Sequence, residues 1–154
     1  MVIVQNLQSI DVDCIRIKKC AQSILLFLNY KDFDLGIQFV DDDAMQDYNN
    51  RFRHKNVPTD VLSFPFYPEL KAGDRITAQT KDEKNMGDII IAPAYVKNNL
   101  EQWGQTFEYR LIVLLIHGIC HLLGYDHIED SDYEIMHEQE EAILAHLKSK
   151  GLVS

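Results

Sequence analysis

The chain of 154 residues is 46% hydrophobic and 25% charged, which excludes a disordered chain, a collagen-like chain and a coiled coil. We therefore expect one globular domain that spans residues 1–154. The net charge of −9 argues against a protein that coats nucleic acid, because phosphate contacts need cations.

The N-terminal part of the chain predicts strands that alternate with helices. Short runs rich in β-branched and aromatic residues predict strands at Val2–Gln5, Leu35–Phe39 and Val61–Phe64. Between the first two strands, apolar residues recur every three to four positions, which predicts an amphipathic helix over Val12–Asn29. Three consecutive aspartates then offer an N-cap and first-turn acids for a helix over residues 41–52.

The central part of the chain predicts a long loop, a strand and a helix. Tyr67–Met86 has little periodicity and is typical of a surface loop. Gly87–Ala92 is rich in isoleucine and predicts a strand. Pro93 suits the first turn of a helix that continues to about Trp103.

Two further helices are predicted in the C-terminal part. Thr106 is expected to cap a helix that ends at Gly124, and this helix should be buried and central because Leu111–Leu115 is apolar on all sides. Ser131 and the glutamate three residues later predict a capping box that opens a final helix to about Leu147. Four strands and about five helices without a regular βαβ repeat favour an α+β fold with a small mixed four-stranded sheet.

The sequence gives no sign of a membrane or secreted protein. Its longest apolar runs, Ile24–Leu28 and Leu111–Ile116, are far shorter than a membrane-spanning helix. The N-terminus lacks the pattern of a secretory signal, and three cysteines are too few for a disulfide framework. We therefore expect a cytoplasmic protein.

The most informative stretch is His117-Gly-Ile-Cys-His121-Leu-Leu-Gly124-Tyr-Asp-His127. His117 and His121 are four residues apart on a helix, so their imidazoles share one face. Gly124 can adopt the left-handed conformation that ends the helix, after which the chain can return His127 to the same point. Three imidazoles with an open fourth position are typical of a catalytic zinc site, so we predict one Zn²⁺ on the central helix, with nickel as an alternative.

The histidine spacing coincides with the zinc-peptidase pattern H-E-x-x-H-x-x-G-x-x-H, except that Gly118 stands where those enzymes carry their glutamate base. Glycine cannot accept a proton, which disfavours peptidase chemistry. Phosphodiester hydrolysis fits better, because a metal polarises a phosphoryl oxygen and a guanidinium stabilises charge on the phosphate. The densest basic cluster of the sequence offers such groups: Arg51, Arg53, His54 and Lys55.

The motifs HGICHLLGYDH, NNRFRHKNVPTDVLSFP and GDIII resemble those of the YbeY family of bacterial endoribonucleases. The resemblance spans about Tyr48 to His127 and extends more weakly along the whole chain. It implies a zinc-dependent, single-strand-specific endoribonuclease that acts in rRNA processing, chiefly at the 3′ end of the small-subunit RNA, and in ribosome quality control. The expected partners are single-stranded RNA and the small ribosomal subunit, with no DNA or membrane partner.

Carried onto this sequence, the resemblance implies that the family's arginine falls on Arg53, which we predict to be catalytic. Its guanidinium can form two parallel hydrogen bonds to a phosphate. The family's three metal ligands fall on His117, His121 and His127.

Four other motif positions carry their own expectations. Asn56 stands where the family usually has aspartate, and Cys120 replaces a usual leucine and is expected to pack in the core. Asp60 and Ser63 match the family, and we expect them to close the turn before the strand by side-chain hydrogen bonds.

Two other functions fit the sequence. A metallopeptidase-like hydrolase needs a carboxylate base from outside the helix, and a non-enzymatic ribosome-associated protein needs only a structural metal. RNA cleavage instead requires Arg53 to face the histidines, so that phosphate and metal share one cleft. A structural metal is fully coordinated, with no open position.

Eight acids and no lysine or arginine lie between Asp126 and Glu141. Because such a segment repels phosphate, we expect it to stay off the RNA path. Its helix is expected to keep the acids in water and to pack four apolar residues inward: Ile135, Ile143, Leu144 and Leu147.

Overall fold

The computed structural model describes all residues from 1 to 154. The helices and strands follow in the order β1 (Val2–Asn6), α1 (Cys14–Phe27), β2 (Asp34–Phe39), α2 (Asp42–Arg53), β3 (Val61–Pro65), β4 (Asn85–Ile91), α3 (Pro93–Asn98), α4 (Phe107–Leu122) and α5 (Asp130–Ser149). Short 3₁₀ turns lie at Lys81–Glu83 and Leu100–Gln102. Four strands and five α-helices confirm the expected α+β fold.

The four strands form one mixed sheet in the order β1-β2-β4-β3. β1, β2 and β4 run parallel, whereas β3 runs antiparallel to β4, with Ser63 opposite Ile89. Alternate residues of β2, Leu35, Ile37 and Phe39, are fully buried. They belong to the main core together with residues of α1, α4 and α5, so this face of the sheet is the one that the helices cover.

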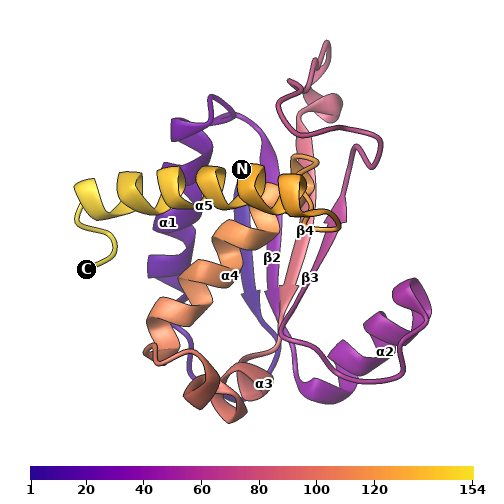
Figure 1. The fold of residues 1–154 in the computed structure, drawn as a ribbon, viewed down its shortest axis with the longest axis vertical. Helices are drawn as coiled ribbons and strands as arrows, with labels where there is room; N and C mark the ends of the chain where they lie inside the picture. The colour runs from indigo at the N-terminus through magenta and orange to yellow at the C-terminus, as the bar shows by residue number, and fades with distance from the viewer.

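α4 is buried and central, as predicted, because it contacts β3 and β4 on one side and α5 on the other. In Figure 1, α1, α4 and α5 gather on one side of the molecule, whereas α2 extends away from them. α2 is anchored by a smaller apolar cluster in which Met45 packs with Leu62 and Ile90. α2 therefore packs through this smaller cluster rather than in the main core.

Two predicted N-caps are confirmed in the structure. The Asp41 and Thr106 side chains each accept a hydrogen bond from a backbone N–H in the first turn of α2 and α4, respectively, and Asp13, which was not predicted as a cap, does the same for α1. Gly124 follows α4 with a φ of +90°. None of the helices combines the length and the hydropathy that a bilayer span requires.

The helix predicted from Pro93 to Trp103 is interrupted at Asn99. The Asn99 side-chain amide donates to the carbonyl of Tyr95 at 2.8 Å, and its oxygen accepts from Gln102 at 3.0 Å. These bonds satisfy polar groups at the end of α3, so the chain tightens into a 3₁₀ turn instead of continuing as an α-helix.

The capping box predicted at Ser131 is wrong. α5 begins at Asp130, Glu129 is its N-cap without a side-chain hydrogen bond, and Ser131 already lies inside the helix. A residue with helical backbone angles cannot act as the N-cap, because the cap needs an extended conformation. The expected inward face also needs correction: Ile135 is 50% exposed and Met136 is buried, whereas Ile143 and Leu147 are buried as predicted.

Candidate metal centre and its cleft

α4 places the imidazoles of His117 and His121 one turn apart on the same side of the helix. Their ring centroids lie 4.4 Å apart and their Nε2 atoms 2.9 Å apart. The other side of this turn packs on the sheet, where a Cβ added to Gly118 would lie 3.0 Å from the side chain of Ile89. The position at which zinc peptidases carry glutamate therefore faces the core and has no room for a carboxylate.

The turn at Gly124 brings His127 to the same point. A Cβ at Gly124 would collide with the backbone carbonyl of Leu70, so both the positive φ and this close approach require glycine. The His127 ring centroid lies 5.6 Å from that of His117 and 5.3 Å from that of His121. One ring nitrogen from each of the three histidines lies within 4.8 Å of the other two.

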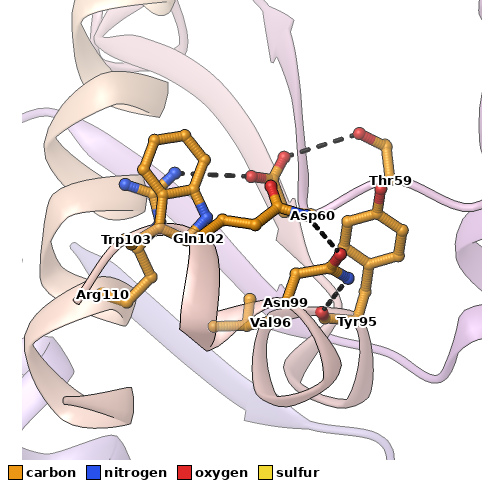
Figure 2. Close-up of a pocket in the computed structure, with 8 residues that line it drawn as sticks. All are labelled: Thr59, Asp60, Tyr95, Val96, Asn99, Gln102, Trp103 and Arg110. Carbon is orange, nitrogen blue, oxygen red and sulfur yellow. Dashed lines mark hydrogen bonds and ion pairs between the residues drawn. The ribbon is translucent and has the colours of Figure 1, made fainter. Parts of the chain in front are cut away.

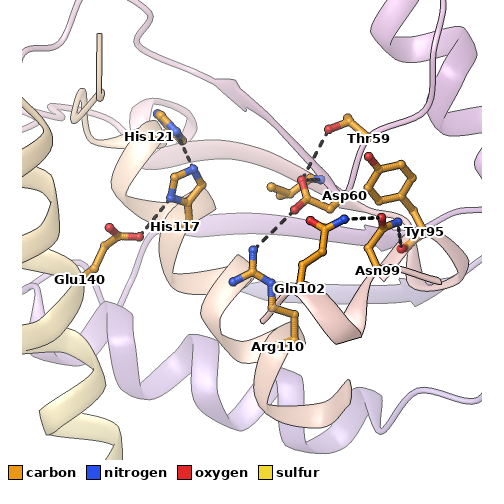
Figure 3. A network of polar contacts seen from close by, with 10 residues as sticks. Thr59, Asp60, Tyr95, Asn99, Gln102, Arg110, His117, His121 and Glu140 are labelled. Carbon is orange, nitrogen blue, oxygen red and sulfur yellow. Dashed lines mark hydrogen bonds and ion pairs between the residues drawn. The ribbon is translucent and has the colours of Figure 1, made fainter. Parts of the chain in front are cut away.

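The second ring nitrogen of each helix histidine has a fixed acceptor. Nδ1 of His121 lies 2.9 Å from the Tyr125 carbonyl oxygen, and Nδ1 of His117 lies 3.0 Å from Oε2 of Glu140 (Figure 3). Because both partners accept, the neutral rings carry their protons on Nδ1 and their lone pairs on Nε2. These lone pairs face each other across 2.9 Å and repel unless a cation lies between them. The donor set therefore fits a divalent metal ion.

Burial and the neighbouring His117 lower the pKa of His121 to about 4, although the bond to the Tyr125 carbonyl favours the charged form. His121 is therefore neutral near pH 7, which is the form that binds metal. His117 and His121 are half-buried, whereas His127 is exposed. Imidazole nitrogens suit zinc and nickel alike, so the three donors indicate a divalent transition metal without distinguishing between the two.

The three histidines open into a cleft of about 580 Å³ that Arg53 also lines. Arg53 ends α2, and His54 after it adopts a left-handed conformation with a φ of +58°. The Arg53 side chain is exposed and forms no salt bridge, whereas Arg51 pairs with Asp47 at 3.5 Å. The cleft therefore combines three imidazoles with a guanidinium that no carboxylate of the protein neutralises.

Sequence reasoning missed Glu140, which the acidic segment was expected to keep in water. Its carboxylate is half-buried against His117. Glu140 lies four residues after Met136 and three before Ile143, which places it on the buried side of α5. An acid at an inward position of an amphipathic helix was the available signal. The orientation of His117 thus depends on an element that lies outside the histidine motif.

A second missed feature is the partly buried ion pair between Asp60 and Arg110 (Figure 2). Asp60 accepts from the backbone N–H of Val61 at 2.8 Å, which confirms its expected local bond. The second carboxylate oxygen of Asp60, Oδ2, lies 3.7 Å from the Arg110 guanidinium. The same guanidinium also lies 3.7 Å from the centroid of the Trp103 ring. Burial lowers the pKa of Arg110, and the charge of Asp60 opposes this effect.

The remaining motif residues have structural roles. The Ser63 hydroxyl does not close the turn as expected but donates to the Gly118 carbonyl at 3.3 Å, which joins β3 to α4. Cys120 is fully buried in the core, as predicted, and burial raises the pKa of its thiol. Asn56 is exposed and accepts a hydrogen bond from Gln46 at 3.0 Å.

The family model and the sequence relatives name the same family. The family model described as "Endoribonuclease YbeY" matches residues 3–148. A human protein named endoribonuclease YbeY is 35% identical over 94% of this chain and 87% of its own. The protein of the same name from Caldicellulosiruptor bescii is 34% identical over 98% of both chains. A solution structure of a Thermotoga maritima protein shares the fold, with a TM-score of 0.58 and 24% identity over 99% of this chain and 95% of that one.

Proposed function

Because this chain belongs to the YbeY family of endoribonucleases, we propose that residues 1–154 form a single metal-dependent domain that cleaves single-stranded RNA within the strand. The proposal rests mainly on the shared cleft, which Arg53 lines together with three converging imidazoles. A cation site and a free guanidinium on one cleft suit a phosphodiester, whose charge must be neutralised as the bond breaks.

His117, His121 and His127 are the proposed ligands, and Zn²⁺ is the proposed ion. A bound divalent ion supplies positive charge that polarises a phosphoryl oxygen and acidifies water. The protein's own contribution is orientation: Glu140 and the Tyr125 carbonyl hold the two helix imidazoles with their Nε2 atoms inward.

Arg53 is the proposed catalytic residue. Its guanidinium is planar, stays charged at any working pH and can form two parallel hydrogen bonds to phosphate oxygens. The exposed end of α2 allows it to reach a phosphate in the cleft without first breaking an ion pair. Its catalytic contribution requires contacts that strengthen as charge develops on the phosphate oxygens.

The biological substrate that we propose is ribosomal RNA, at the 3′ end of the small-subunit RNA and in ribosome quality control, in the cytoplasm. Family membership supports an RNA substrate, and association with the small ribosomal subunit is the finer part of the proposal. The two competing functions are weaker. Gly118 faces the core, and Glu140, the carboxylate that α5 brings to the site, is hydrogen-bonded to Nδ1 of His117. The three histidines would give an ion three protein ligands, fewer than the four of a closed structural site.

The test is cleavage of a single-stranded RNA by the purified protein, with and without a chelator and with added Zn²⁺. We expect internal cuts that the chelator abolishes and zinc restores. A duplex of the same sequence serves as the control and should resist. Peptide hydrolysis without RNA cleavage, or cleavage that is insensitive to complete metal removal, would contradict the proposal.

A further inference from the structure

A second groove, of about 560 Å³, adjoins the metal cleft between α4, α5 and the turn that holds Trp103. The two hollows share three lining residues, Asp60, Val61 and His117, so the groove begins where the candidate ligands end. Its volume falls within the range of about 300–1,000 Å³ that is usual for small-molecule sites. A substrate that spans the metal cleft therefore has space to place a neighbouring group in this groove.

Two exposed aromatic rings line the groove. Trp103 is 48% exposed although its indole is in contact with the Arg110 guanidinium. Tyr133, on α5, is 58% exposed and stacks on His137, with ring centroids 5.9 Å apart and an interplanar angle of 4°. Each ring is thus supported by a planar neighbour while much of its surface remains available for stacking.

The charges in the groove disfavour phosphate. Glu140 and Glu141 both line it, and its buried cation, Arg110, is already paired with Asp60. Arg53, by contrast, lines the metal cleft and not this groove. Aromatic surfaces beside carboxylates suit an uncharged ring that carries N–H donors, and nucleobases are such rings.

We propose that this groove binds a nucleobase of the nucleotide next to the scissile phosphate, with stacking on Trp103 and Tyr133. The proposal depends on the nuclease function proposed above, of which it names the base subsite. The phosphate then faces Arg53 and the histidines, and the base faces α5. Stacking is tolerant of base identity, so the subsite adds affinity for single-stranded RNA rather than strict sequence preference.

Trp103 is the sole tryptophan of the chain, so its fluorescence reports the groove without any need for catalysis. The metal-free protein is titrated with adenosine, with a short oligoadenylate and with ribose 5-phosphate, which lacks a base. We expect adenosine and the oligoadenylate to quench Trp103 and ribose 5-phosphate to leave it unchanged. Equal quenching by ribose 5-phosphate, or none by any of the three, would overturn the proposal.

Two variants distinguish the loss of stacking in the groove from the general effect of removing an exposed aromatic ring. Tyr133→Ala should raise the Kd for the oligoadenylate about fivefold or more, because one aromatic surface is lost. Phe27→Ala removes another exposed aromatic ring, 41% exposed on α1 and outside the groove, and should leave the Kd unchanged. Equal Kd values for Tyr133→Ala and the unaltered protein would count against the subsite.

The base-subsite proposal and the nuclease proposal can be rejected separately, because each predicts a different result. RNA cleavage without quenching of Trp103 retains the nuclease and rejects the base subsite. Quenching by adenosine in a zinc-loaded protein that does not cut RNA supports base binding in the groove and rejects the nuclease function.

Discussion

At the scale of single residues, the histidines of the candidate metal centre are oriented by acceptors that lie outside the triad. Glu140 and the Tyr125 carbonyl hold the Nδ1 protons of the two helix histidines, and this leaves both Nε2 atoms aimed at one point. The imidazoles therefore need little rearrangement when an ion binds.

Replacing one ligand should empty the site. His121→Ala removes a third of the protein ligands, so we expect metal content to fall from about one ion per chain to near zero after dialysis. Elemental analysis measures this. His137→Ala, at an exposed histidine outside the triad, is the control and should keep its metal. Full metal content in His121→Ala would contradict the ligand assignment.

Glu140 should act as a positioning residue for the metal. Glu140→Ala releases His117 from its acceptor, and we expect metal affinity to fall about 10- to 100-fold, as measured by competition with a chromogenic chelator. Glu141→Ala removes the neighbouring acid, which is exposed, and should leave affinity unchanged. Partial recovery in Glu140→Gln, whose amide oxygen still accepts, would support orientation of the ring as the cause.

Arg53 should affect turnover more than binding. We expect Arg53→Ala to lower the single-turnover rate of RNA cleavage about tenfold or more, on the order of 1.4 kcal/mol in the barrier, at unchanged metal content. Arg53→Lys should recover only part of the rate, because an ammonium lacks the planar fork. Equal rates for Arg53→Ala and the unaltered protein would reduce Arg53 to a surface charge.

At the scale of elements, the contact between the Gly124 turn and the loop at Leu70 can be measured against a matched glycine. Gly124 and Gly73 both have φ values near +90°, but only at Gly124 does an added Cβ meet the backbone. We expect Gly124→Ala to lower the free energy of unfolding by about 2 kcal/mol or more, and Gly73→Ala by about 1 kcal/mol. Denaturant unfolding measures both free-energy changes. Equal losses of stability in the two variants would show that the close contact with Leu70 does not contribute to the cost of the substitution.

Most element boundaries could be predicted because local pattern determines them. The apolar spacing of α1, the aspartate before α2 and the glycine after α4 are signals carried by neighbouring residues. The break at Asn99 and the true start of α5 at Asp130 could not be predicted in the same way. Several polar residues near each boundary could form a side-chain hydrogen bond to the backbone, and the tertiary structure decides which of them does.

At the scale of the whole molecule, the candidate site combines local and distant information. The three histidines lie within eleven residues, so their spacing alone predicts a common point. Glu140 approaches His117 only because α5 packs on α4, and Asp60 meets Arg110 across 50 residues of sequence. Such pairs follow from the packing of elements, which a single sequence does not specify.

The acidic helix α5 divides the surface into an RNA-accepting and an RNA-repelling part. Its acids are exposed except for Asp132 and Glu140, which are half-buried, and no lysine or arginine lies between Asp126 and Glu141 to offset phosphate repulsion. We expect photo-crosslinks from bound RNA to concentrate on the basic residues from Arg51 to Lys55, and, if a base enters the groove, to reach Tyr133 alone on α5. Crosslinks spread along the exposed acidic face of α5 would contradict this division.

The three imidazoles of the proposed metal site are buried to unequal degrees. His117 and His121 are held on a rigid helix with fixed acceptors, whereas His127 follows a glycine turn and is exposed. A ligand whose displacement breaks few other contacts is expected to detach first, and in the proposed site that ligand would be His127. We therefore expect a bound ion to have a shorter residence time when the turn after the helix is altered, because the helix is then left to hold the ion through His117 and His121 alone.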